Sequence, residues 1–312
     1  MKCGICRILG STLDARDTMK QQPQRFLFII NPIAGVRSKK DIPQQIQSVF
    51  EGSGREYEIV FTKARGHATE LAQEAVSKNF DAVVAVGGDG TVNEVATGLV
   101  GQTPALGIIP LGSGNGLARH LQIPIHIRKS IQYLLKAAPI TIDHCRLNDL
   151  PFFCTAGVGF DAQVGKVFAE QKTRGFSTYL KTVITEYKSY KCESYKLSID
   201  GRKMEIQAFL LSFANASQYG NNVFIAPQAS LQDGYIDVCM MHPFPLWTLL
   251  NLGVKLFTKK VNTFHYLDIV KAKHVEIERN AHGPVHLDGE PMHMDARLTV
   301  TIVPNSLRVL SV

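Results

Sequence analysis

The chain has 312 residues, of which 45% are hydrophobic and 20% charged, and this balance excludes a fibrous or mainly disordered protein. No apolar run reaches the roughly 20 residues that a membrane-spanning helix needs. The formal net charge is +7, and Lys and Arg are spread along the chain without interleaved aromatic residues. We therefore expect peripheral contact with an anionic membrane surface and no nucleic-acid partner.

The first 24 residues lack sustained hydrophobic periodicity, and we expect them to form a flexible leader. From Arg25 onward, short apolar runs alternate with amphipathic segments. The apolar runs predict buried strands at 26–30, 57–61, 82–86 and 105–109, and the amphipathic segments predict helices at 41–50, 67–76 and 91–100. This alternation favours a three-layer α/β domain with a parallel sheet over residues 25–143.

After residue 143 the pattern changes to short strands separated by turns. Strands are predicted at 152–158, 194–199, 206–213, 235–241 and 275–278, with helices at 177–190 and 245–257. Asp200-Gly201 is typical of a hairpin turn. We predict a β-sandwich-like domain over residues 144–295. The tail at 296–312, with strands at 297–303 and 307–312, is expected to pack back on the first domain.

The segment 245–257 has two interpretations. It carries Trp247 and several leucines, and Lys259 and Lys260 follow it. We prefer a helix in the core of the second domain over one that lies in the membrane interface. The histidines at 274, 282, 286 and 293 lack the spacing of a zinc site, so we expect them to be solvated or to cap elements.

The most informative stretch begins where the strand at 82–86 runs into Gly87-Gly88-Asp89-Gly90-Thr91. Glycines let a chain approach a ligand closely, and the N–H groups of a helix N-terminus bind anions. Asp89 beside a phosphate makes sense as a Mg²⁺ ligand, although a helix-capping role would fit this turn alone equally well. A similar turn, 112–116, follows the next strand, and such sheet edges bind ligands. The two turns together predict a site for one phosphate chain.

Asp288-Gly289-Glu290 places two carboxylates about a glycine bend, from which both could point into one site. Phosphoryl transfer needs alignment and charge neutralisation, and a carboxylate near the accepting hydroxyl can take its proton. A surface hairpin turn is the plainer interpretation of these three residues alone. The sequence leaves open whether Asp288 or Glu290 is the base.

Several motifs in a fixed order resemble those of the diacylglycerol kinase catalytic-domain superfamily, which includes bacterial lipid kinases and the sphingosine and ceramide kinases. The resemblance runs from Phe26 to the end of the chain. Its motifs are Asn31-Pro32-Ile33-Ala34-Gly35, Thr62 with Gly66-His67-Ala68, GGDGTVNEV at 87–95, PLGSGNGLAR at 110–119, Asp143, GVGFD at 157–161, LQDGYID at 231–237 and LDGE at 287–290. The resemblance implies an NAD-kinase/phosphofructokinase-like first domain, with the active site between the domains.

The resemblance also implies an ATP- and Mg²⁺-dependent lipid kinase. ATP would be bound by Asn31, Pro32, Ile33, Ala34, Gly35, Thr62, Gly87, Gly88, Asp89, Gly90, Thr91, Val92, Asn93 and Ser113. Asp89 would help to hold the catalytic Mg²⁺, and Asp288 and Glu290 would activate the lipid hydroxyl. Ser230, Asp233 and Tyr235 match a structural Mg²⁺ site of bacterial members.

The lipid substrate is left open between diacylglycerol and a sphingoid base. We expect a cytoplasmic protein that associates peripherally with membranes, and a homodimer is left open. Two other functions are considered. One is a soluble-substrate kinase of the NAD kinase or phosphofructokinase type, which shares the Gly-Gly-Asp-Gly turn. The other is a non-enzymatic nucleotide or lipid sensor.

Overall fold

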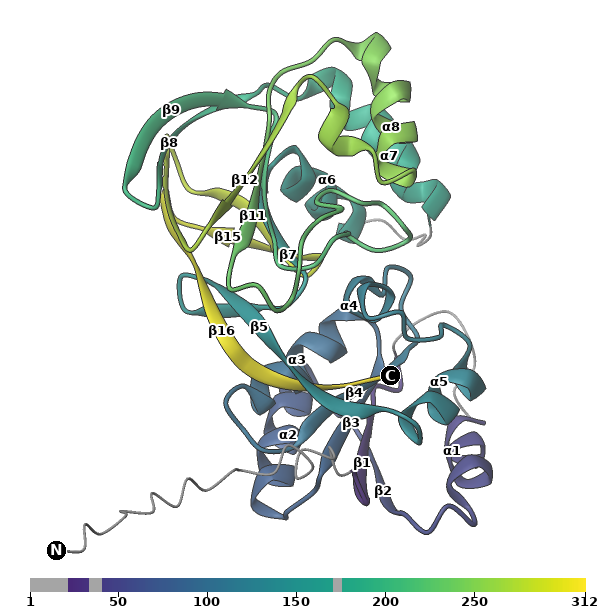
Figure 1. Cartoon of the computed structure of the whole chain (residues 1–312). Helices are drawn as coiled ribbons and strands as arrows, with labels where there is room; N and C mark the ends of the chain where they lie inside the picture. Colours follow the sequence, from purple (N-terminus) through teal and green to yellow (C-terminus); the bar gives the residue numbers. More distant parts are fainter. Residues whose placement is uncertain (1–21, 34–40, 171–175) are drawn as a thin grey trace, which may run out of the picture.

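The computed structural model describes residues 22–33, 41–170 and 176–312. Residues 1–21 of the expected leader, and Ala34 and Gly35 of the expected nucleotide site, lie outside the described residues. The described chain forms two lobes, one above the other in Figure 1. None of its helices is both long enough and apolar enough to cross a membrane.

The first lobe is the predicted three-layer α/β domain. Its parallel strands are β1 (Arg25–Ile30), β2 (Glu56–Phe61), β3 (Ala82–Gly87) and β4 (Ala105–Pro110), in the sheet order β2-β1-β3-β4. One face is covered by α1 (Ile42–Phe50) and α5 (Ile127–Leu134), the other by α2 (His67–Ser77) and α3 (Asp89–Leu99). The short α4 (Gly116–His120) follows β4. Because helices cover both faces, β1, β3 and β4 are almost wholly apolar.

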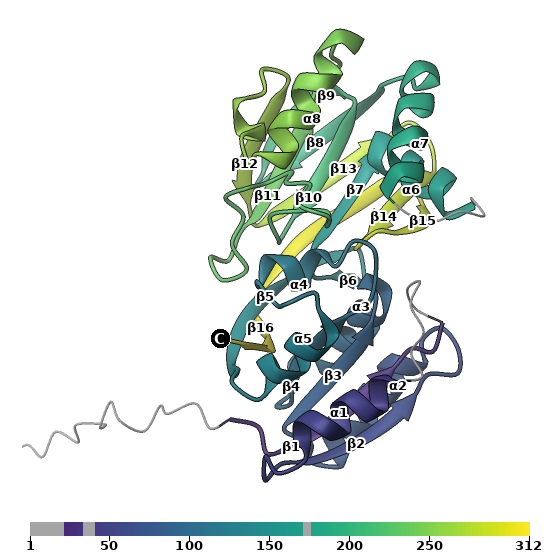
Figure 2. The ribbon, with the colours of Figure 1, turned by 90° about the vertical axis from the view of Figure 1, so that its right-hand side faces the viewer.

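The second lobe is the predicted β-sandwich-like domain (Figure 2). One sheet has the order β12-β11-β10-β7-β14-β15. Its strands are β7 (Thr155–Gly159), β10 (Leu210–Ala214), β11 (Ile236–Met241), β12 (Leu267–Ala272), β14 (Gly283–Leu287) and β15 (Glu290–Met294). Facing it across a shared apolar core lie β8 (Glu193–Ile199), β9 (Arg202–Ala208) and β13 (His274–Arg279). The outer face of the six-stranded sheet packs against α6 (Phe160–Glu170), α7 (Phe176–Ser189) and α8 (Leu249–Phe257), with a short 3₁₀ helix, η1 (Leu246–Thr248), before α8.

Two long strands join the lobes. β5 (Ala138–Leu147) and β16 (Arg297–Ser311) pair antiparallel and run from one lobe into the other (Figure 1). β16 pairs with β13 in the second lobe, and its Val309 lies opposite Leu106 of β4 in the first. The two tail strands expected from the sequence are thus one strand, with a shift of register between Val303 and Leu307.

Two of the predicted strands are divided in the structure. The run 152–158 is split because β6 (Leu150–Phe152) pairs with β5, whereas β7 begins at Thr155 in the other sheet. The run 206–213 is split between β9 and β10, which belong to different sheets. Apolar periodicity alone does not reveal that a chain passes from one sheet to the other.

The helix at 245–257 is not the core helix that the sequence favoured. Leu252 is buried against the second lobe. A second apolar face of η1 and α8 is exposed: Leu246 is 49% exposed, Trp247 83%, Leu250 80% and Val254 55%. The segment is therefore apolar on two sides, of which the described residues cover one.

Candidate active site between the lobes

The described residues of the predicted nucleotide site lie near one edge of the parallel sheet. Because neighbouring strands point the same way, the segments after β1, β2, β3 and β4 all begin at this edge. Asn31 donates from its side-chain amide Nδ2 to the hydroxyl of Thr91 at 3.1 Å, which joins the segment after β1 to α3. Thr62 donates its backbone N–H to the carbonyl of Ile30. Ser113 is exposed at the tip of the turn after β4.

The two glycine turns are in direct contact, and Asp89 joins them. A Cβ atom on Gly112 would lie only 2.8 Å from the Cα atom of Gly88, so glycine is needed at this approach. The Asp89 carboxylate accepts the backbone N–H groups of Asn115 and Gly116, both at 2.8 Å. Burial raises the pKa of Asp89 to about 6, although these two N–H groups oppose the shift. Asp89 therefore holds the second turn against the first residue of α3.

The second lobe delivers Asp288 through a hairpin turn. Asp288 and Gly289 connect β14 to β15 with φ angles of 48° and 85°, as in a tight two-residue hairpin. The hairpin turn considered from the sequence is thus present, and its first side chain points inward. The Asp288 carboxylate accepts the backbone N–H groups of Phe153, Cys154 and Thr155 at 3.0, 2.7 and 3.1 Å. Asn93 of α3 donates to it at 2.8 Å. Burial raises the pKa of Asp288, and these donors oppose that shift.

Glu290 has a different setting from that of Asp288. Its side chain is 51% exposed, and its Oε1 atom would lie 2.9 Å from a Cβ atom on Gly90. Its Oε2 atom lies 3.8 Å from the guanidinium of Arg65, an exposed pair of weak energy. The Glu290 carboxylate therefore faces the first turn of α3 and stays open to a ligand.

Asp89, Asp288 and Glu290 thus converge from two lobes on the first turn of α3. Burial is the main cause of the raised pKa of Asp89, and the negative charge of Asp288 contributes to it. Carboxylate oxygens are the ligands that Mg²⁺ prefers, and Mg²⁺ is commonly held by one or two of them together with phosphate. Among the described residues these three carboxylates do not form a metal site by themselves, so a Mg²⁺ ion here would need the phosphate oxygens of a nucleotide as further ligands.

Two predicted nucleotide residues have other partners. Val92 is buried in the core of the first lobe, so its side chain packs α3 against the sheet. Asn93 directs its amide to Asp288 and to the carbonyl of Pro151. These two residues contribute to the shape of the site and to the contact between the lobes.

One of the predicted structural metal residues, Asp233, is paired with a lysine. Asp233 lies with its Oδ2 atom 2.6 Å from the Nζ atom of Lys271, and its Oδ1 atom accepts the N–H of Tyr235 at 3.1 Å. Hydrogen bonds and charge from Asp233 and Asp237 raise the pKa of Lys271 on balance, although burial acts in the opposite direction. Among the described residues, no group of three or more His, Cys, Asp or Glu side chains is arranged to hold a metal. The carboxylate that the resemblance assigns to Mg²⁺ therefore faces an ammonium group.

Sequence reasoning missed two further polar residues near the site. Glu94 accepts the N–H groups of Gly66 and Ala68 at 2.9 and 3.2 Å, and so fixes the start of α2 against α3. His286 was expected to be solvated or to cap an element, and this expectation is wrong. It is buried, with its Nε2 atom 3.1 Å from the Oδ2 atom of Asp161. The sequence did hold one signal for this burial. His286 stands between two apolar residues, Val285 and Leu287, in a strand whose last three residues are all buried.

Comparison with known proteins identifies the family. The family model described as diacylglycerol kinase catalytic domain matches residues 25–147, and the one described as YegS C-terminal NAD kinase beta sandwich-like domain matches residues 154–311. The chain is 30% identical to the diacylglycerol kinase of Bacillus subtilis, over 86% of this chain and 90% of that protein. It is 31% identical to a Pseudomonas aeruginosa protein named "Probable lipid kinase YegS-like", over 82% of this chain and 85% of that protein.

A solved structure shares the fold. A crystal structure named as a diacylglycerol kinase from Bacillus anthracis superposes with a TM-score of 0.74 at 24% identity, over 94% of this chain and 98% of that chain. At this identity the likeness concerns the fold alone. The two family models and the relatives, by contrast, match the amino-acid sequence, and the relatives match along most of their length. The chain therefore belongs to the family of diacylglycerol kinases and YegS-like lipid kinases.

Proposed function

We propose that the chain transfers the γ-phosphoryl group of ATP to a hydroxyl group of a membrane lipid, between the two lobes. The observation that carries this proposal is the position of Glu290, a second-lobe carboxylate beside Gly90 of the first glycine turn. A phosphate chain at the turn and an acceptor hydroxyl near Glu290 would meet at the first turn of α3. The family to which the chain belongs supports a lipid as the acceptor.

In this proposal Glu290 is the general base and Asp288 is a positioning residue. The hydroxyl oxygen of the lipid forms a bond to the γ-phosphorus, the bond from that phosphorus to the bridging oxygen breaks, and ADP leaves. The hydroxyl proton passes to the Glu290 carboxylate. Asp288 is less available to a lipid hydroxyl because four N–H donors already occupy its carboxylate oxygens. Its bonds hold the hairpin so that Glu290 reaches Gly90.

The phosphates of ATP would lie against the N–H groups at the start of α3 and along the turn after β4. Mg²⁺, when bound between Asp89 and the nucleotide, would neutralise the charge of the transferred phosphoryl group. Arg65, 3.8 Å from Glu290 and exposed, is placed to meet a phosphate at the same position.

The roles of Glu290 and Asp288 are distinguished by two isosteric substitutions. Glu290→Gln should lower kcat about a hundredfold or more while the KM for ATP and the melting temperature stay near the wild-type values, because only proton acceptance is lost. Asp288→Asn should lower the melting temperature as well, because its amide would present hydrogen atoms to backbone N–H donors. ADP release and differential scanning fluorimetry measure the two effects. A Glu290→Gln enzyme that keeps a third or more of wild-type turnover would remove Glu290 from the mechanism.

The acceptor is tested by incubating the protein with ATP and each of several alcohols. Diacylglycerol and a sphingoid base in mixed micelles represent the two lipid classes, and NAD and fructose 6-phosphate represent the soluble-substrate kinases. We expect ADP release and product phosphate only with a lipid. Phosphate on NAD or fructose 6-phosphate alone would favour the soluble-substrate alternative, and tight ATP binding without any product would favour a sensor.

We also propose that the exposed apolar face of η1 and α8 rests on an anionic membrane. Leu246, Trp247, Leu250 and Val254 recur at helical spacing on this face. Lys259 and Lys260 follow directly and are exposed, so that apolar and basic groups would meet acyl chains and headgroups together. Such a contact would bring the protein to its substrate.

Trp247 allows a direct test, because it is the only tryptophan in the chain. Vesicles of phosphatidylcholine with about one third phosphatidylglycerol should shift its emission to shorter wavelength and should sediment the protein. Leu250→Ser with Val254→Ser should weaken sedimentation at least tenfold, since each buried apolar side chain contributes about 1.5–3 kcal/mol. Activity on a short-chain, water-soluble diacylglycerol should stay unchanged. Unchanged emission with vesicles, or a protein dimer that buries Trp247 in solution, would contradict the proposal.

A further inference from the structure

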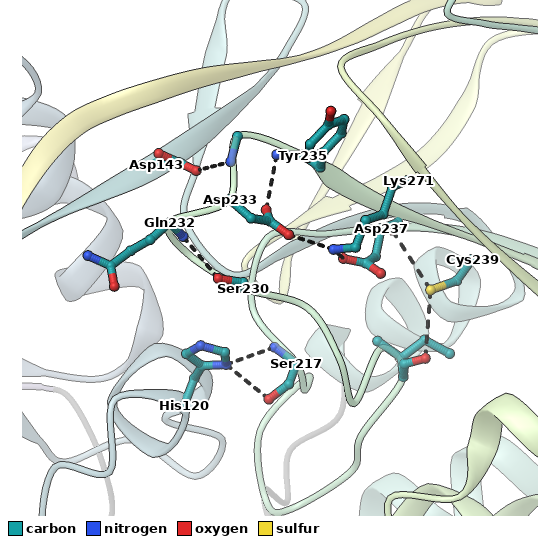
Figure 3. A network of polar contacts seen from close by, with 12 residues as sticks. His120, Asp143, Ser217, Ser230, Gln232, Asp233, Tyr235, Asp237, Cys239 and Lys271 are labelled. Carbon is teal, nitrogen blue, oxygen red and sulfur yellow. Dashed lines mark hydrogen bonds and ion pairs between the residues drawn. The ribbon is translucent and has the colours of Figure 1, made fainter.

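The 230–235 loop is held to both lobes by hydrogen bonds. Asp143 of β5 accepts the N–H of Gly234 at 2.8 Å through one carboxylate oxygen and the N–H of Asn305 at 2.8 Å through the other. Gln232 donates from its side chain to the carbonyl of Thr141 at 2.8 Å. Figure 3 shows Gln232, Asp233 and Tyr235 of this loop, with Asp143 on one side of it and Lys271 on the other. The loop that precedes β11 is therefore bonded to β5, and Asp143 of β5 also binds β16.

Lys271 is the charged group that faces the loop from the second lobe. It lies on β12 directly opposite Asp237 of β11 in the antiparallel pairing. Its Nζ atom lies 2.6 Å from the Oδ2 atom of Asp233 and 3.3 Å from the Oδ2 atom of Asp237. The Asp237 side chain is only 5% exposed, whereas that of Lys271 is 41% exposed. One ammonium group thus bridges two carboxylates, one of them almost fully enclosed (Figure 3).

The bonding of Asp233 leaves little room for a metal ion. Its Oδ1 atom accepts the Tyr235 N–H, and its Oδ2 atom is bound by the Lys271 ammonium. A divalent cation at Asp233 would have to displace the ammonium group and would then stand close to that positive charge. Coulomb repulsion between a lysine and a divalent ion at such a distance opposes joint binding.

We propose that Lys271 supplies the positive charge that a divalent cation would otherwise supply at the 230–235 loop, so that the fold of this loop is independent of Mg²⁺. The lysine replaces the ion by bridging Asp233 and Asp237, which would repel one another without it. It also binds the loop to β12 through its own side chain. The catalytic metal proposed at Asp89 is a separate matter, because Asp89 lies at the start of α3 and its carboxylate is bound by the turn after β4.

The loop is joined to the candidate active site by a short chain of hydrogen bonds. Asn215 donates from its side-chain amide to the carbonyl of Asp143 at 3.0 Å and to the carbonyl of Phe153 at 2.9 Å. The N–H of Phe153 in turn holds Asp288. A loop that loses its bridging charge can therefore disturb Asp288. Through these bonds Lys271 can affect the activity of the enzyme as well as its stability.

Melting temperatures with and without Mg²⁺ test the proposal, and no nucleotide or lipid is added. The wild type should melt at the same temperature, within about 1 °C, in EDTA and in 5 mM MgCl₂. Lys271→Ala should melt about 3 °C or more lower in EDTA, because one of the two carboxylates left facing each other is almost enclosed. Added MgCl₂ should recover at least half of this loss, since the ion can take the place of the ammonium. Lys271→Arg should behave as the wild type.

Two controls assign the effect to this pair of carboxylates. Lys273 is a second lysine next to the loop, with its ammonium 5.1 Å from the centre of the Tyr235 ring. Lys273→Ala should therefore show no recovery by MgCl₂. The double variant Lys271→Ala with Asp233→Asn should also show no recovery, because the second carboxylate needed to bind the ion is gone.

Three results would overturn the proposal. A wild type stabilised by MgCl₂ through Asp233, with the effect lost in Asp233→Asn, would mean that the metal displaces the lysine. A Lys271→Ala protein as stable as the wild type in EDTA would mean that the charge is not needed. A Lys271→Ala protein that is destabilised but not recovered by MgCl₂ would mean that the lysine does not stand in for a cation. These readouts do not depend on which substrate the enzyme uses.

Discussion

Burial gives the acidic side chains near α3 different chemistry. Asp89 is enclosed and its pKa is raised to about 6, whereas Asp288 is held by several N–H donors and Glu290 is half exposed. Their environments thus differ, and under the proposed function they would serve as a metal ligand, a positioning group and a base. Asp89 lies in the glycine turn at the start of α3, whereas Asp288 and Glu290 lie at the hairpin turn between β14 and β15.

The raised pKa of Asp89 predicts a pH-dependent loss of stability. The folded protein holds a proton on Asp89 up to about pH 6, whereas the unfolded chain releases it near the ordinary value of 3.8. Stability therefore falls as the pH rises between these values and levels off above them. Relative to Asp89→Asn, the free energy of unfolding of the wild type should fall by about 2 kcal/mol from pH 4.5 to pH 7. Urea denaturation measures it, and a difference that is constant with pH would contradict the shift.

Asn93 should couple α3 to the second lobe through Asp288. Asn93→Ala removes one of the two N–H donors to the Oδ2 atom of Asp288, where only the N–H of Phe153 remains, and we expect a loss of about 1–3 kcal/mol in unfolding free energy. Asn93→Asp should destabilise more, because it adds a second carboxylate at 2.8 Å from the first. Chemical denaturation near pH 7 ranks the two variants, and an Asn93→Asp protein as stable as Asn93→Ala would contradict this contact.

At the scale of elements, two turns and one hairpin make the site. The turns after β3 and β4 touch because neither Gly88 nor Gly112 has a side chain at their closest approach. The Asp288-Gly289 turn then brings a strand end of the second lobe against α3.

Gly112→Ala should separate the two turns. The new methyl group would lie 2.8 Å from the Cα atom of Gly88, and backbone atoms on both sides must move. We expect a loss of about 1–3 kcal/mol in stability and a higher KM for ATP. The matched control is Gly253→Ala in α8, where nothing lies within 4 Å of the added atom. The control should leave the KM unchanged, and an unchanged KM in Gly112→Ala would contradict a phosphate site at these turns.

At the scale of the whole molecule, β5 and β16 make the lobes one cooperative unit. Both strands belong to the ten-stranded sheet that runs through the two lobes. Asp143 on β5 and Asn305 on β16 are also hydrogen-bonded to each other. The lobes therefore share backbone pairing as well as the contact at Asp288, and neither should unfold alone.

Val309→Ala tests this cooperativity. Val309 is fully buried in β16 within the first lobe, and the truncation should lower stability by about 2 kcal/mol. Hydrogen exchange at β3 in the first lobe and at β11 in the second should accelerate by the same factor. Val270→Ala on β12, which is 37% exposed, should change neither by much. Faster exchange confined to β3 would mean that the lobes open independently.

The sequence by itself determined the parallel sheet, the two glycine turns and the hairpin at Asp200-Gly201. These features depend on residues close together in the chain, through apolar periodicity and through turns that need particular backbone angles. The motifs in order also identified the family, since their spacing is carried by the sequence alone.

Only the tertiary structure decided the partners of the charged side chains. Asn93 and Asp288 are 195 residues apart, and Asp233 and Lys271 are 38 apart, so no local pattern indicates that they meet. The sequence of α8 likewise does not show which of its apolar residues are buried, because that depends on which elements pack against the helix. Long-range packing determines the solvation of each group, and solvation determines whether a carboxylate binds a cation, accepts a proton or holds a lysine.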